Sequence, residues 1–141
     1  MPQILEHIDA IARKLKRSVL FICFDEHIEG GDFSDWLDFD YEDSAIRNTV
    51  IEWLDSQKIG WRPCGHFANV NAMAGYRGQI YVDVPYDESL PEYKVLEAYL
   101  ENPDGTMRFP EVGFYYCPLE MAMINAAHDE PGFWDRWAEN F

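Results

Sequence analysis

The spacing of apolar residues divides the chain into short helices and strands. Apolar side chains recur at helical spacing over residues 3–16, which predicts a first helix. The run from Ser18 to Phe24 is short, apolar and rich in β-branched and aromatic residues, as is typical of a buried central strand. Residues 36–41 alternate between two sets, with Leu37, Phe39 and Tyr41 in one and Trp36, Asp38 and Asp40 in the other. This period of two predicts an edge strand or an extended segment lying on the domain.

The middle of the chain predicts a helix and two further strands. Residues 44–57 carry apolar residues at helical spacing, and Asp43 or Ser44 supplies a cap for the first turn. Residues 60–67 and 78–85 predict two strands, and the second of them alternates clearly.

The last third predicts two helices around one strand and a short aromatic helix at the end. The sequence Ser89-Leu-Pro-Glu92 has the form of a capping box with an early proline, so we expect a helix over residues 90–101. Residues 112–117 predict a buried strand, and residues 118–127 predict a helix. The final helix has an apolar side that we expect to dock onto the domain, formed by Phe133, Trp134, Trp137 and Phe141.

Apart from the possible extra edge strand at residues 36–41, the predicted elements between residues 18 and 117 follow the order βαββαβ, with helices added at both ends. This order is that of the ferredoxin-like arrangement. We therefore expect an α+β fold in which four antiparallel strands carry helices 44–57 and 90–101 on one face. A length of 141 residues suits a single domain, which would span residues 1–141.

Cysteine usage and hydropathy predict where the protein resides. Cys23, Cys64 and Cys117 are odd in number and widely spaced, which does not fit a disulfide framework. The first residues lack the basic start and apolar core of a signal peptide, and no apolar stretch approaches the length of a membrane span. These features predict a soluble, cytoplasmic protein.

Charge is the most unusual property of the chain and is concentrated in one segment. The sequence has 26 Asp and Glu against 11 Lys and Arg, a formal net charge of −15. Nine of those acids lie in residues 25–43, which contain no Lys or Arg, whereas four basic residues crowd residues 13–17. A field of this sign repels nucleic acid and anionic membranes and attracts basic proteins.

This segment predicts a protein-binding surface, because aromatic residues are interleaved with its acids. Charge would steer the encounter with a basic partner, and aromatic side chains would anchor it. We therefore expect a non-enzymatic inhibitor or immunity-type protein that engages a basic, nucleic-acid-directed protein, such as a nuclease or toxin. The expected binding residues are Asp32, Asp35, Trp36, Asp38, Asp40 and Glu42.

One alternative is a metal-dependent hydrolase or phosphodiesterase. Asp25 follows the first predicted strand, where Glu26 or Asp83 could complete a two-carboxylate metal site. His27 or His66 would then transfer protons. The alternating carboxylates of residues 38–42 could also bind a divalent cation, although the spacing of an EF-hand is absent.

Other arrangements of chemical groups are less supported by the sequence. Cys64 and His66 form a single close pair, whereas structural zinc usually has two such pairs. No Gly-rich phosphate-binding motif occurs, so we expect no cofactor. A third reading is a homo-oligomeric module that binds a small molecule, in which an open sheet face or the aromatic C-terminus forms a homodimer contact.

Overall fold

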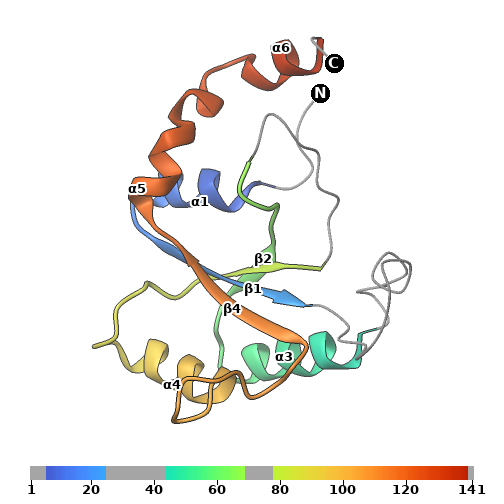
Figure 1. The fold of residues 1–141 in the computed structure, drawn as a ribbon, viewed down its shortest axis with the longest axis vertical. Helices are drawn as coiled ribbons and strands as arrows, with labels where there is room; N and C mark the ends of the chain where they lie inside the picture. Colours follow the sequence, from blue (N-terminus) through green and yellow to red (C-terminus); the bar gives the residue numbers. More distant parts are fainter. Residues whose placement is uncertain (1–5, 25–43, 69–77, 140–141) are drawn as a thin grey trace.

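The fold is α+β and is built on one antiparallel sheet (Figure 1). The computed structural model describes residues 6–24, 44–68 and 78–139, without the side chains of Trp137 and Ala138. Its four strands lie in the order β2-β3-β1-β4. Their bounds are Val19–Phe24 for β1, Trp61–Pro63 for β2, Ile80–Val82 for β3 and Val112–Cys117 for β4.

The first strand is central, as its apolar run predicted. Leu20 of β1 lies opposite Val82 of β3, and Val19 of β1 lies opposite Cys117 of β4; both pairings are antiparallel. Because side chains alternate along a strand, β1 supplies apolar side chains to both faces of the sheet. One strand therefore anchors two separate layers of helices.

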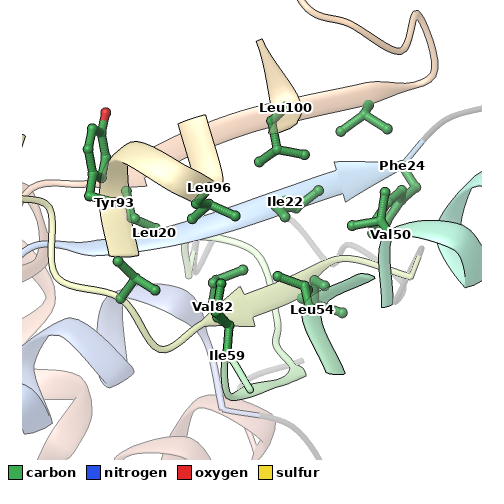
Figure 2. Close-up of a cluster of buried hydrophobic side chains, with 13 residues drawn as sticks. Leu20, Ile22, Phe24, Val50, Leu54, Ile59, Val82, Tyr93, Leu96 and Leu100 are labelled. Carbon is green, nitrogen blue, oxygen red and sulfur yellow. The ribbon is translucent and has the colours of Figure 1, made fainter. Parts of the chain in front are cut away.

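Helices α3 (Ala45–Ser56) and α4 (Pro91–Leu100) cover one face of the sheet. Figure 2 shows the contact, with side chains from β1 directed toward side chains from both helices. Ser44 caps α3 by accepting a hydrogen bond from the backbone N–H of Arg47, as one of the two predicted caps required. The largest fully buried side chains of this core are Leu20, Ile22, Leu54, Ile80, Leu96 and Leu100.

The opposite face is covered by elements from the two ends of the chain (Figure 1). Helix α1 (Ile8–Leu15) packs against α5 (Leu119–Ala122) and the 3-10 helix η2 (Met123–Asp129), and α6 (Phe133–Glu139) follows. The buried residues of this second core are Ile8, Ile11, Ala12, Val19, Cys64, Tyr81, Cys117 and Ala122.

Three predicted elements differ from the observed ones in extent. Strands 60–67 and 78–85 are each reduced to three paired residues. Gly78, at the start of the second predicted strand, adopts a positive φ of 86° and lies outside β3. The helix predicted over residues 118–127 is a single α-turn that continues as 3-10 helix.

The predicted capping box is wrong. Leu90, rather than Ser89, is the N-cap residue of α4, and no side chain caps this helix. The Ser89 hydroxyl instead donates to the Asp87 carboxylate at 2.6 Å, within the preceding turn. Pro91 still occupies the first helical turn, where it needs no hydrogen-bond acceptor.

The last strand is not the buried strand that was predicted. Among the described strands β4 lies at the edge of the sheet, and its Tyr115 and Tyr116 are 53% and 50% exposed. Only its first and last residues, Val112 and Cys117, are buried. The prediction of a strand is therefore confirmed, and the prediction that it is buried is wrong for its middle residues. The predicted edge strand at residues 36–41 lies outside the described residues.

Candidate functional site

The residues expected to bind a basic partner lie outside the part of the chain that the structure describes. The same holds for the alternative metal ligands Asp25 and Glu26 and for His27. The undescribed partner-binding residues are Asp32, Asp35, Trp36, Asp38, Asp40 and Glu42.

The basic residues before β1 are engaged by carboxylates of the same chain. Arg13 binds Asp129 through two hydrogen bonds, Nε to Oδ2 at 2.7 Å and Nη2 to Oδ1 at 2.9 Å. Its Nη1 donates to Asp9 at 2.8 Å. Arg17 pairs with Asp83 at 3.1 Å, and Lys14 lies 3.8 Å from a carboxylate oxygen of Glu6. The cluster at residues 13–17 is thus largely neutralised within the fold.

Asp9 is fully buried and its remaining lone pairs are satisfied. Its Oδ1 accepts the backbone N–H of Ala68 at 2.9 Å, and its Oδ2 accepts the side-chain amide of Asn125 at 3.1 Å. Burial by itself would raise the pKa of Asp9, but the hydrogen bonds from Arg13, Ala68 and Asn125 outweigh it and lower that pKa. This network joins α1 to η2 and to the segment before residue 69, which is a structural role.

A shallow depression lies at the β2 edge of the sheet, beside the end of α1. It has a volume of about 310 Å³ and is lined by Leu15, Gly60, Trp61, Arg62, Tyr81 and Asp83. The Tyr81 hydroxyl donates to Asp83 Oδ1 at 2.8 Å, and the guanidinium of Arg62 lies 5.4 Å from the centre of the Tyr81 ring. Burial and the neighbouring Asp83 raise the pKa of Tyr81 to about 12, so its phenol stays protonated.

Asp83 is the one carboxylate of the alternative metal site that lies within the described residues. Its side chain is held by Tyr81 and Arg17. Within residues 6–24, 44–68 and 78–139, no three His, Cys, Asp or Glu side chains gather closely enough to hold a metal ion. The depression therefore presents the ion pair of Arg17 with Asp83 and the neutral phenol of Tyr81.

None of the three cysteines is in a disulfide, and two of them lie deep in the fold. Cys64 and Cys117 are buried, and Cys23 is half-buried. Burial raises the pKa of Cys64 to about 12 and that of Cys117 to about 11. Thiols that resist ionisation are poor nucleophiles and poor metal ligands, so the structure favours a packing role for both. No zinc-like group of ligands forms around Cys64 and His66 among the described residues.

The C-terminal aromatic residues dock as predicted where the structure describes them. Trp134 stacks on the ring of His7, with the ring centres 5.4 Å apart, and Phe133 stacks on His128 at 4.4 Å. Burial lowers the pKa of His128. The side chains of Trp137 and Phe141 lie outside the described residues.

An exposed aromatic and apolar surface on and around β4 was not predicted. Tyr116 stacks on Tyr86, which precedes α4, with ring centres 4.6 Å apart. On the other face of the strand, Tyr115 contacts Phe21 at 5.5 Å. Three further apolar side chains that follow the strand in sequence, on α5 and η2, are also exposed: Met121, Met123 and Ile124. Two adjacent tyrosines necessarily place one ring on each face, and that signal was available in the sequence.

No described helix combines the length and apolar character needed to cross a membrane. No protein-family model, no curated protein and no solved structure matches this chain.

Proposed function

We propose that this chain is a non-enzymatic acidic binding protein of the inhibitor or immunity type. Its partner would be a basic, nucleic-acid-directed protein, bound without direct contact between this chain and nucleic acid. The binding residues would lie in residues 25–43 and would include Asp32, Asp35, Trp36, Asp38, Asp40 and Glu42. Acidic side chains would occupy the positions of phosphates, and aromatic side chains would anchor the contact.

The observation that carries this proposal is the internal use of the basic residues. Arg13 and Arg17 each hold carboxylates on other elements, and Arg62 lies 3.3 Å from Glu6. These pairs consume positive charge from residues 6–24 and 44–68, whereas residues 25–43 contain nine acids and no Lys or Arg. The excess of negative charge is therefore available to an external partner.

We also propose a ferredoxin-like core and a cytoplasmic location. The strand order β2-β3-β1-β4, the connections through α3 and α4, and the packing of both helices on one face support this core. Three cysteines without a disulfide support a reducing compartment. The fold alone carries no argument about function.

The decisive experiment compares two triple variants that lose the same charge from different places. One neutralises the acidic segment through Asp35→Asn, Asp38→Asn and Asp40→Asn. The matched control neutralises three exposed acids elsewhere through Glu52→Gln, Glu88→Gln and Glu139→Gln. Wild type and both variants are immobilised, exposed to an extract of the source cell at low salt, and eluted with increasing salt.

We expect wild type and the control to retain a basic protein that elutes as salt rises, and the acidic-segment variant to lose at least about tenfold of that capture. Subsequent titration of the purified partner should give an affinity that falls steeply with salt concentration. Equal capture of the basic protein by both variants would show that binding does not depend on the acids of residues 25–43 in particular. Capture that persists at high salt would remove the role of charge.

A further inference from the structure

The outer edge of β4 is a row of backbone groups next to exposed tyrosines. β4 is the last strand of the sheet, and along it only β1 pairs with it among the described residues. Edge strands of this kind act as templates for an additional strand, unless lysine, proline or a bulge protects them. β4 contains none of the charged side chains that commonly provide such protection.

Two hydrogen bonds beside the paired residues of β2 and β3 show which residues of β3 direct their N–H and C=O groups toward β2. The N–H of Cys64 donates to the C=O of Gln79 at 3.3 Å, and the N–H of Asp83 donates to the C=O of Gly60 at 2.8 Å. The odd-numbered residues of β3 therefore face β2. Because successive residues of an antiparallel strand direct their backbone groups to opposite sides, the even-numbered residues of β3 face β1.

The same alternation continues across β1 into β4. Ile22 lies opposite Ile80, so the even-numbered residues of β1 face β3 and its odd-numbered residues face β4. Phe21 lies opposite Tyr115, which directs the backbone of Tyr115 toward β1. The N–H and C=O groups of Phe114 and Tyr116 are consequently on the outer side of β4, where an added strand would bind.

The side chains around this edge suit an interface. Tyr115 and Tyr116 expose about half of their surface, one on each face of the sheet, and would flank an added strand. Tyrosine contributes strongly to binding because it buries a large rigid surface at small cost in conformational entropy. Ile124, in the 3-10 helix that follows in sequence, is 78% exposed.

The charges around this edge select a basic partner. Residues 109–135 contain no Lys or Arg, whereas Glu111 precedes β4 and Glu120 follows it. A second copy of this chain would bring the same acids, and a net charge of −15, against this surface. A segment that carries lysine or arginine would instead be attracted.

We infer that the outer edge of β4 binds an extended lysine- or arginine-bearing segment of a partner protein, which adds to the sheet as a fifth strand. This inference rests on the proposed function for the charge of the partner, and it assigns a second contact surface distinct from residues 25–43. Main-chain hydrogen bonds to Phe114 and Tyr116 supply the pairing. Tyr115 and Tyr116 supply the side-chain contacts on the two faces.

The probe for this inference is a short synthetic peptide in which lysine and valine alternate. A second peptide of the same sequence is N-methylated on the amides of its valines, so it keeps its charge and loses hydrogen-bond donors on one edge. The peptide could direct either its valine amides or its lysine amides toward β4. A third peptide is therefore N-methylated on the amides of its lysines. Affinities are measured by calorimetry, and amide exchange in this protein is followed by NMR with and without each peptide.

We expect the unmodified peptide to bind at least about tenfold more tightly than the weaker of the two methylated peptides, since each lost hydrogen bond leaves a backbone group unpaired. The amides of Phe114 and Tyr116 should exchange more slowly in its presence, whereas those of Gly113 and Tyr115 are already held by β1. Tyr116→Pro removes one outward donor and leaves the pairing with β1, so it should weaken the unmodified peptide by a similar factor. Val95→Thr, at an exposed apolar residue of α4, is the control and should have no effect.

Equal binding of all three peptides, with no change in exchange at Phe114 and Tyr116, would overturn the inference even if wild type captures a basic protein. In that case residues 25–43 alone would carry the proposed function. Protection of these two amides that depends on protein concentration, without peptide, would show a second copy at this edge and would also overturn it. Peptide-dependent protection in a chain that captures no basic protein would support the edge and refute the proposed function.

Discussion

Arg13 on α1 and Asp129 at the end of η2 form a paired contact of two hydrogen bonds between residues 116 positions apart in the sequence. The guanidinium side chain is only 4% exposed and also holds the fully buried Asp9. Paired, planar contacts of this kind are the strongest form of ion pair that proteins make. This one fastens the first helix to the C-terminal layer.

Arg13→Ala should therefore destabilise the protein strongly, by about 3–5 kcal/mol, because it leaves the Asp9 carboxylate buried without its cation. The measurement is the free energy of unfolding in urea. Lys14→Ala is the matched control, since that side chain is exposed and its change should stay within about 0.5 kcal/mol. Similar stability losses in the two variants would mean that the buried network contributes little.

Stability should also fall in mild acid through His128. Burial lowers the pKa of His128 in the folded protein, so the unfolded chain takes up a proton at a higher pH than the folded chain does. The stabilisation of the folded protein that comes from keeping His128 neutral is complete above the ordinary histidine pKa of about 6.5, and it is lost as pH falls below that value. Nearby Asp9 and Asp129 oppose this shift, and Arg13 and His7 reinforce it.

The measurement for His128 is the urea midpoint above and below this pH, for wild type and for His128→Asn. Wild type should lose more stability than the variant on acidification, because asparagine does not titrate. Carboxylates titrate alike in both proteins and cancel in the comparison. Parallel losses in the two proteins would exclude His128 as the source.

Cysteine alkylation should separate the three thiols. At about pH 8, a thiol with a pKa of about 12 has only about one molecule in ten thousand as the reactive thiolate. Native protein treated with iodoacetamide should therefore be modified at Cys23, with Cys64 and Cys117 protected until the chain is unfolded. Mass spectrometry of the peptides reports each site. Rapid modification of Cys64 in the native protein would contradict the burial described for it.

The stacked pair of Trp53 and Tyr99 should couple α3 to α4. Their rings are parallel within 2°, and the ring centres lie 3.9 Å apart. A double-mutant cycle with Trp53→Ala and Tyr99→Ala should give a coupling free energy of about 0.5–1.5 kcal/mol. The control cycle pairs Trp53→Ala with Val95→Ala on the exposed side of α4 and should give additive changes.

Much of the architecture could be predicted from local patterns. β1 was recognised because a short run of β-branched and aromatic residues is typical of a buried strand. α3 was recognised because the cap Ser44 and the apolar spacing after it both indicate a helix. The packing of α3 and α4 on one face follows from the order of the elements. The candidate site was identified from the density of acids and the aromatic residues interleaved with them, and its residues 25–43 lie outside the described structure.

The errors have separate physical causes. Periodicity identified Val112–Cys117 as a strand, but the exposure of its residues depends on which strands pair with it, which periodicity does not report. The capping box failed because the Ser89 side chain bonds to Asp87 in the preceding turn and Leu90 takes the N-cap position. Asp129 and Asp83, which pair with Arg13 and Arg17, lie 116 and 66 residues away, so these two ion pairs were invisible in the sequence.

The pairing of Arg13 with Asp129 also sets the order in which the molecule can be completed during synthesis. Ribosomes add about 5–20 residues per second, so Arg13 precedes its acceptor by on the order of ten seconds. During that interval the face of the sheet behind α1 lacks the cover of α5 and η2. Helix α1 is thus synthesised well before the segment that fastens it, and this contact can form only after Asp129 has emerged.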